Sequence, residues 1–160
     1  MTVWGIGGKW LLWSLLASAP VVVCAAVFRE SLVVTAISPW WFYGAGIAIL
    51  LAGIPFWFIS AITLRKAHQA ETLCTSGVFA LCRNPIYAAW ILFLVPGFVL
   101  FFRNPLLLAI PFIMYVVLRL VLPGEEAWLA EKYGEAYRDY SKRVARILPY
   151  ARRKSPMTDD

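Results

Sequence analysis

Four long apolar runs, separated by short polar segments, dominate this 160-residue chain. They extend over about residues 10–28, 40–64, 86–102 and 106–122. A helix of roughly 17–25 apolar residues is long enough to cross the hydrocarbon core of a bilayer, which is about 30 Å thick. The pattern therefore predicts an all-α integral membrane protein with about four transmembrane helices.

The segment after the fourth run has a different period. From Glu125 to about residue 150, apolar side chains recur every three or four residues, which predicts an amphipathic helical segment. The stripe consists of Leu129, Tyr133, Tyr137, Tyr140 and Val144. Gly134 interrupts it and predicts a division into two short helices. Tyrosines at this spacing are more typical of a belt at the membrane interface than of a binding site.

Prolines and glycines predict where the apolar helices bend and end. Pro55 and the pair Pro96-Gly97 lie inside the second and third runs. A proline inside a helix removes a backbone hydrogen bond, so we expect a kink at each place. The pair Pro123-Gly124 follows the fourth run and predicts that its helix ends there.

The composition supports a membrane location. Hydrophobic residues make up 61% and charged residues 15% of the chain, whereas soluble domains carry roughly a quarter charged residues. At this length we expect one domain over residues 1–160. The first run follows Lys9 and contains Ala17-Ser18-Ala19, which resembles a signal-peptide cleavage site. Because apolar residues continue to Phe28, we favour a retained helix over a cleaved signal peptide.

Positive charge lies mainly on one side of the predicted spans. The net charge is +6, and because the basic residues flank apolar runs, anionic lipids match them better than nucleic acid. Twelve Lys and Arg residues fall in the termini and the Arg65–Arg83 loop, whereas only Arg29 and Arg103 fall on the other side. The positive-inside rule then places both termini and this loop in the cytoplasm, with the spans in the inner (cytoplasmic) membrane.

The cysteines and the single histidine form no metal motif. Cys24 lies inside an apolar run, and the spacing of Cys74 and Cys82 is unlike the tight ligand pairs of zinc sites. Any disulfide scheme would leave one of the three cysteines unpaired. We therefore expect free thiols and no metal site.

One tripeptide occurs twice, as Arg83-Asn84-Pro85 and as Arg103-Asn104-Pro105. In both places asparagine can cap a helix and proline can occupy its first turn, so the tripeptide by itself predicts only a helix start. The first copy differs because Gly77 and Phe79 precede it and Tyr87 follows it.

Two further polar features accompany the fourth run. The pair Glu125-Glu126 follows Pro123-Gly124, where acidic residues suit the positive end of a helix dipole. Neighbouring helical residues point about 100° apart, so one glutamate can serve the dipole while the other faces a ligand. Arg119 is an ionisable residue within a predicted span. Its side chain can either have a functional role or simply extend to the membrane interface, and the sequence leaves both interpretations open.

The segments 75–87 and 125–149 together resemble the two motifs of isoprenylcysteine carboxyl methyltransferases and their phospholipid methyltransferase relatives. The first is similar to the family pattern R-H-P-x-Y-x-G, with Asn84 at the histidine and Ala89 at the final glycine. Asparagine can still form hydrogen bonds there, although it cannot titrate. The second contains Glu125-Glu126, Tyr133-Gly134 and Arg146-Ile147-Leu148-Pro149.

The resemblance implies S-adenosylmethionine bound at the cytoplasmic interface, and methyl transfer to a lipid-like acceptor of the isoprenylcysteine carboxylate type. A carboxylate acceptor is already ionised, so it needs orientation and a water-poor site but no general base. In this interpretation Arg119 holds the anionic head of the acceptor. The implied cofactor-binding residues are Gly77, Phe79, Arg83, Asn84, Tyr87, Glu125 and Glu126.

Two alternatives remain open from the sequence. Membrane sterol reductases end in a similar Tyr-Gly and Arg-x-x-Pro pattern and use NADPH, although they are usually much longer. The second alternative is a non-catalytic membrane protein that keeps the fold of the methyltransferases. The paired glutamates favour the methyltransferase, whereas Asn84 and Ala89 leave room for the non-catalytic alternative.

Overall fold

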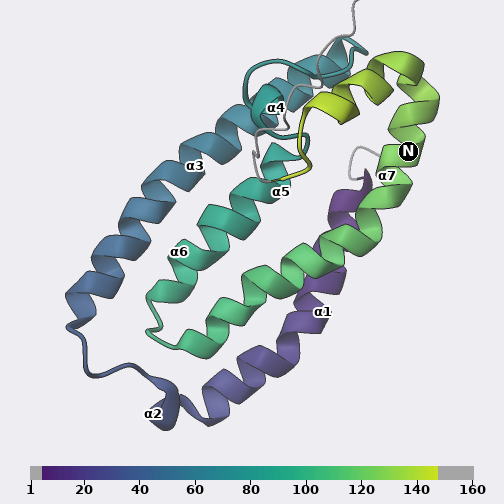
Figure 1. Ribbon diagram of the computed structural model, residues 1–160. Coiled ribbons are helices and arrows are strands. Elements are labelled where there is room, and N and C mark those ends of the chain that lie inside the picture. The colour runs from purple at the N-terminus through teal and green to yellow at the C-terminus, as the bar shows by residue number, and fades with distance from the viewer. Residues whose placement is uncertain (1–4, 148–160) are drawn as a thin grey trace, which may run out of the picture.

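The structure, a computed structural model, describes residues 5–147, and helices are its regular elements throughout this range (Figure 1). The all-α prediction is therefore confirmed. The elements are α1 (Gly5–Val27), α2 (Arg29–Leu32), α3 (Pro39–Gln69), α4 (Val78–Leu81), α5 (Pro85–Ala89), the π-helical turn η1 (Trp90–Leu94), α6 (Val95–Leu100), the 3₁₀ turn η2 (Pro105–Leu108) and α7 (Ala109–Arg143).

Three helical segments are long and apolar enough to cross a membrane, namely Ile6–Val27, Pro39–Gln69 and Pro105–Arg143. The third predicted span corresponds to a shorter apolar helix, Pro85–Leu100. At 1.5 Å per residue it extends for about 24 Å, which is less than the thickness of a typical hydrocarbon core. The chain is an integral membrane protein with three long spans and one shorter apolar helix.

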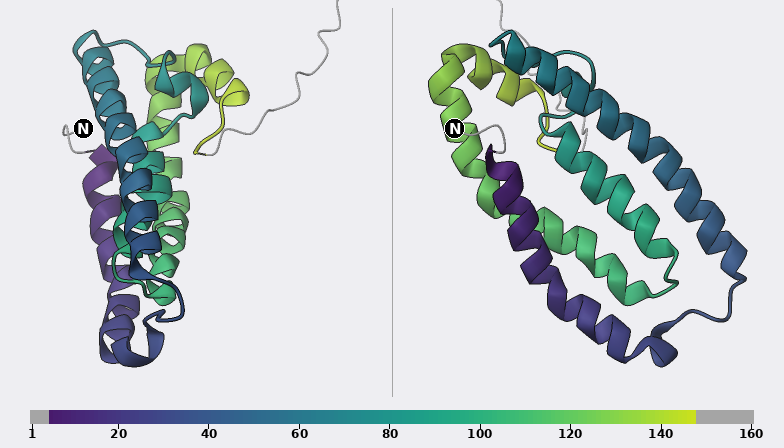
Figure 2. Two further views of the ribbon diagram at one scale, coloured as in Figure 1. Left: turned by 90° about the vertical axis from the view of Figure 1, so that its left-hand side faces the viewer. Right: turned by 180° about the vertical axis from the view of Figure 1, so that it is seen from behind.

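The long helices lie side by side in the order α3, α5–α6, α7, α1 (Figures 1 and 2). Residues 28–38, which include α2, connect the two outer helices at one end. The loop with α4, the start of α5 and the last turns of α7 gather at the opposite end (Figure 1). Segments far apart in the sequence therefore meet at this second end.

The core lies between the helices, and the outer faces are apolar. Leu118 and Leu122 of α7 are almost completely buried, and the Trp10 indole of α1 donates a hydrogen bond to the Met114 carbonyl at 3.0 Å. Large apolar side chains such as Trp40 remain exposed on the outside, as expected for surfaces that face lipid.

Pro96 produces a π-helical turn in the third apolar helix. The Val95 amide bonds to the carbonyl of Trp90, five residues earlier, within η1. Because proline supplies no N–H, the local hydrogen-bond register shifts and the extra residue is absorbed as a π-bulge. In the second run, α3 continues through Pro55 without ending.

The prediction that the fourth helix ends at Pro123-Gly124 is wrong. α7 continues through both residues, and the break occurs at Gly134, with φ 57° and ψ −130°. A proline inside a helix costs about 3 kcal/mol, but α7 is held on both sides, by burial of Leu122 and by ion pairs of Glu126. The predicted division at Gly134 is confirmed, because this backbone conformation is essentially available only to glycine.

Gly53 permits a close approach between α3 and η1, which generates a stability test. A Cβ atom at this position would overlap the Phe93 Cβ, whereas one at Gly44 of the same helix would meet nothing within 4 Å. We expect Gly53→Ala to lower the thermal midpoint in detergent, because a packed core must shift to accept the methyl group. Gly44→Ala is the matched control and should be neutral or stabilising, since alanine gains up to about 1 kcal/mol of helix propensity. Equal midpoints for the two variants would contradict the packing argument.

Candidate functional site

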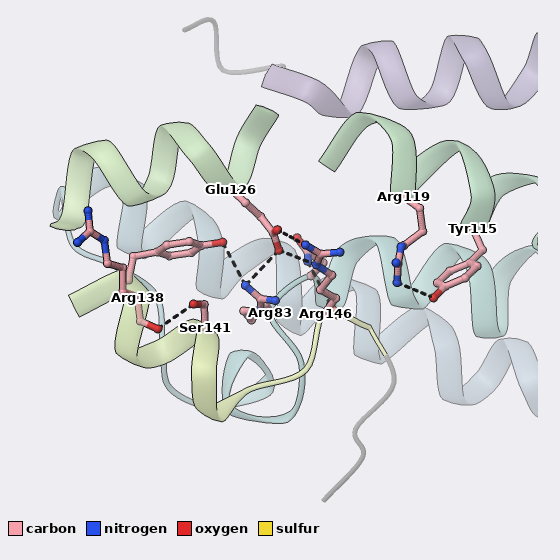
Figure 3. Close-up of polar contacts among 9 residues, drawn as sticks. Arg83, Tyr115, Arg119, Glu126, Arg138, Ser141 and Arg146 are labelled. Carbon is pink, nitrogen blue, oxygen red and sulfur yellow. Dashed lines mark hydrogen bonds and ion pairs between the residues drawn. The ribbon is translucent and has the colours of Figure 1, made fainter. Parts of the chain in front are cut away.

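The two polar segments singled out in the sequence meet at one end of the helix bundle. Arg83 lies just before α5 and Glu126 lies in α7, and their Nη1 and Oε1 atoms are 3.1 Å apart (Figure 3). The two side chains are mostly buried, with exposed fractions of 12% and 16%. The ion pair therefore joins segments separated by more than forty residues of sequence.

Glu126 is held by a second arginine as well. Arg146 donates from Nε to Oε1 at 3.0 Å and from Nη2 to Oε2 at 2.6 Å (Figure 3). This two-pronged contact is the geometry in which a guanidinium binds a carboxylate most strongly. The hydrogen bonds to Glu126 raise the pKa of the Arg146 guanidinium, which stays charged. Both oxygens of Glu126 are thus occupied by cationic donors.

Residues 144–147, here called the C-terminal strap, also pair with the chain before α5. The Arg83 amide donates to the Ala145 carbonyl at 2.8 Å, and the Asn84 amide donates to the Arg146 carbonyl at 3.1 Å. The Asn84 side chain adds a third bond, from Nδ2 to the same Arg146 carbonyl, at 3.1 Å. The strap is therefore tied to this segment by backbone and side chain alike.

The expectation that Asn84 caps a helix with its side chain is wrong. Its side chain makes no cap bond to α5 and instead faces the strap. Asn104 does form the cap, since its Oδ1 accepts from the Leu106 amide at 3.0 Å. Its Nδ2 also donates to the Ala25 carbonyl of α1 at 3.3 Å. The same tripeptide therefore has two structural roles. Asn104 caps its helix and also binds the α1 carbonyl, whereas Asn84 binds the strap and makes no side-chain cap bond to α5.

The returning part of α7 covers the loop that carries Gly77 and Phe79. Gly77 adopts φ 60° immediately before α4, and Phe79 is buried. The Tyr140 hydroxyl donates to the Phe79 carbonyl at 2.6 Å, and Arg83 Nη1 lies 3.4 Å from the Tyr137 hydroxyl. Both tyrosines are buried, so the interface-belt interpretation is wrong for them. The turn at Gly134 folds them back onto the loop instead of leaving them at the membrane surface.

Glu125 has a different environment from its neighbour. Its Oε2 atom is buried and has no hydrogen-bond partner within residues 5–147. The Nε atom of Arg83 is likewise buried and without a partner in this range. Glu125 lies in α7 just beyond the apolar run of residues 106–122. The helix-dipole explanation for the pair does not hold, because both glutamates lie inside a continuous helix.

Tyr87 lies next to Glu125 and to the first helix. Its hydroxyl interacts electrostatically with the Glu125 carboxylate, and its ring packs edge-on against Trp10, with centroids 4.9 Å apart. A Cβ atom at Gly7 would lie 3.7 Å from the Tyr87 hydroxyl. The first helix therefore contributes to the surroundings of Glu125, which the sequence analysis did not anticipate.

Arg119 lies outside this cluster of contacts. It is exposed on α7, two turns before Glu126, and its Nη1 lies 3.5 Å from the Tyr115 hydroxyl. Figure 3 shows it on the same side of α7 as Glu126. The site therefore combines a tightly paired group around Glu126 with an accessible guanidinium deeper along the helix.

Three site residues were not among those expected from the sequence, namely Arg146, Tyr137 and Tyr140. The Arg-x-x-Pro pattern that begins at Arg146 was visible in the sequence, but nothing in the spacing linked it to Glu126.

The cysteines are free, as expected, and burial raises the pKa of the Cys82 thiol to about 11. Among residues 5–147, no group of three potential metal ligands gathers in one place.

Comparisons with known proteins identify relatives of the chain. A family model described as phospholipid methyltransferase matches residues 41–136. The chain is 31% identical over 105 residues to rat (Rattus norvegicus) protein-S-isoprenylcysteine O-methyltransferase, a match that covers 65% of this chain and 36% of the rat protein. The mouse (Mus musculus) protein of the same name is 35% identical over 104 residues, covering 64% of this chain and 35% of that protein.

A plant relative shows the same partial coverage. A probable protein-S-isoprenylcysteine O-methyltransferase of Oryza sativa subsp. indica is 29% identical over 105 residues, with 65% of this chain and 53% of that protein covered. The match thus spans from about a third to about half of these relatives. No solved structure matches the chain.

The two asparagines generate a paired prediction. Asn104→Ala removes a cap and a bond to α1 from a buried site, so we expect a loss of roughly 1–2 kcal/mol in unfolding free energy. Asn84→Ala removes only the side-chain bond, because the backbone amide still reaches the Arg146 carbonyl. Thermal or denaturant unfolding in detergent should rank Asn104→Ala as the less stable variant. The reverse order would mean that the strap contributes more stability than the cap.

Proposed function

The chain belongs to the phospholipid methyltransferase family, and we propose that it transfers a methyl group from S-adenosylmethionine to a lipid-like acceptor. The family match includes Arg83, Glu125 and Glu126, and Arg83 pairs with Glu126 in the site. The names of the mammalian and plant relatives support an isoprenylcysteine carboxylate as the type of acceptor. The observation that carries the proposal is a pair of buried polar atoms of opposite charge, on Glu125 and Arg83, that have no hydrogen-bond partner in the described part of the chain.

The unpartnered atoms fit the amino-acid end of the cofactor. S-adenosylmethionine carries an ammonium and a carboxylate there, and when bound it supplies the electrophilic methyl group. The Glu125 carboxylate accepts hydrogen bonds from the ammonium, while Nε of Arg83 is available as a donor to the carboxylate. Buried polar groups without partners are costly in a folded protein, so a ligand that satisfies both gains binding energy from each.

The surroundings of these atoms exclude water. Tyr87 lies beside Glu125 and packs edge-on against Trp10, and the strap with Tyr137 covers Arg83. Removing water strengthens electrostatic contacts and orients the reacting groups. The remaining implied residues, Gly77, Phe79 and Asn84, lie in the loop and at its junction with the strap, where they shape the site.

The acceptor is proposed to bind along α7 on the membrane side of this cluster. Arg119 is exposed there beside Tyr115 and can pair with an anionic head group while the lipid tail stays among the apolar helix faces. An ionised carboxylate acceptor requires no general base. The family match favours this reaction over the NADPH-dependent reductase and over a non-catalytic role.

We further propose that the site faces the cytoplasm from the inner membrane, because the basic residues gather at its end of the bundle. Arg65 and Lys66 end the second span there, whereas Arg29 and Arg103 lie at the opposite end.

Ligand binding tests the function. In detergent, isothermal titration calorimetry should detect binding of S-adenosylhomocysteine and no binding of NADPH. Arg119→Ala should leave this binding unchanged while raising the KM for a farnesylcysteine acceptor, because the side-chain bond of Arg119 among residues 5–147 is to Tyr115 and not to Arg83, Glu125 or Glu126. Saturable binding of NADPH without S-adenosylhomocysteine would support the reductase. If neither ligand binds, the non-catalytic alternative is favoured.

Cysteine labelling tests the orientation. Cys74 lies in the loop and is partly exposed, whereas Cys82 is buried. In a variant with Cys24 and Cys82 replaced by serine, a membrane-impermeant maleimide should label Cys74 only after the cells are permeabilised. Thr35→Cys, in the connection at the opposite end, is the matched control and should be labelled in intact cells. Labelling of Cys74 in intact cells would reverse the proposed orientation.

A further inference from the structure

Glu125 and Glu126 are adjacent in α7 but differ in what their carboxylates can still bind. Both oxygens of Glu126 are engaged, by Arg83 at 3.1 Å and by the two-pronged contact of Arg146 at 3.0 and 2.6 Å. Oε2 of Glu125 is buried and has no partner among the described residues. Because neighbouring helical side chains point about 100° apart, the two carboxylates face different surroundings.

We propose that Arg146 is a positioning residue that occupies Glu126, and that Glu125 alone receives the ammonium group of the cofactor. This inference rests on the proposed function and assigns separate roles within the pair of glutamates. Arg146 lies outside the segment matched by the family model, residues 41–136.

The charges around Glu126 oppose the binding of another cation. Arg83, Glu126 and Arg146 together carry a net charge of +1, and both guanidinium groups lie within 3.1 Å of the carboxylate. An ammonium group that approached Glu126 would have to displace a guanidinium or lie next to two of them. At Glu125 the same group meets an unpaired, buried carboxylate oxygen, and its binding relieves the cost of that burial.

Arg146 acts on the site through the strap that carries it. The strap is bound to the Arg83 and Asn84 amides, and the guanidinium then reaches across to Glu126. Glu126 in turn pairs with Nη1 of Arg83, the arginine whose Nε remains unpartnered. Loss of Arg146 would leave Glu126 paired with Arg83 alone, and the carboxylate that orients the Arg83 side chain would no longer be fixed by the strap. Arg146 therefore orients Arg83 without touching the ligand.

A pair of ligands separates the two roles. The first ligand is S-adenosylhomocysteine, and the second is its deaminated analogue, in which hydrogen replaces the α-amino group. Affinities are measured by isothermal titration calorimetry in detergent for the wild type and for Glu125→Gln, Glu126→Gln, Arg146→Gln and Arg146→Lys. The ratio of the two affinities within one variant reports the contribution of the amino group, and it is independent of the fraction of protein that is folded.

We expect the wild type to prefer the amino-bearing ligand by at least about tenfold, and Glu125→Gln to abolish that preference. Glu126→Gln and Arg146→Gln should weaken both ligands by the same factor and leave the preference intact. Arg146→Lys should recover part of the affinity for both ligands, because it keeps the charge but loses the two-pronged contact.

The proposal is overturned if Glu126→Gln abolishes the preference while Glu125→Gln keeps it. It is also overturned if Arg146→Gln leaves both affinities at the wild-type level, since Arg146 then positions nothing. A wild type that binds both ligands equally would retain the proposed function and remove the role of Glu125. A wild type that binds neither ligand would remove the proposed function itself, and this inference with it.

Discussion

The carboxylate of Glu126 is the contact on which the functional end of the molecule depends. It joins the helix that carries it to Arg83 before α5 and to Arg146 in the strap, three segments that are distant in the sequence. Taking the charged side chains of Arg83 and Glu126 out of water is expensive, and such a buried pair persists only where the hydrogen bonds are nearly complete. The hydrogen bonds of Glu126 are complete. Oε2 of Glu125 and Nε of Arg83, by contrast, have no partner among residues 5–147. The three paired side chains therefore hold one another in place, while Glu125 Oε2 and Arg83 Nε remain able to bind a ligand.

Two backbone features of α7 bring the members of this cluster together. Continuation of the helix through Pro123 keeps Glu126 on the same face as Arg119, since seven residues correspond to nearly two full turns. The turn at Gly134 then reverses the chain, so that Tyr137, Tyr140 and finally the strap pack over the loop. A helix that ended at Pro123 would have separated Glu126 from the apolar span. A helix that continued straight through Gly134 would have carried Arg146 away into solvent.

The sequence was sufficient to predict the parts of the fold that depend on local pattern. Run lengths predicted the apolar helices, and the glycine at 134 predicted a break, because each signal acts within a few residues. The errors at Pro123, Asn84 and the buried tyrosines share another cause. In each case the departure from the local preference comes with a contact more than ten residues away; the Asn84 side chain, for example, binds the strap carbonyl and makes no cap bond to its own helix. The Arg146–Glu126 pair was hidden for the same reason, since spacing alone does not identify which charges meet.

The depth of the polar groups along α7 suits the proposed meeting of a water-soluble cofactor with a lipid. Arg119 precedes Glu126 by seven residues, which corresponds to about 10 Å along the helix axis. In the proposed arrangement Arg119 lies nearer the hydrocarbon, at a level that the head of an acceptor reaches while its tail remains in lipid. In the same arrangement Glu125 and Arg83 lie nearer water, where the proposed cofactor enters. One continuous helix through Pro123 therefore sets the distance between the two proposed binding positions.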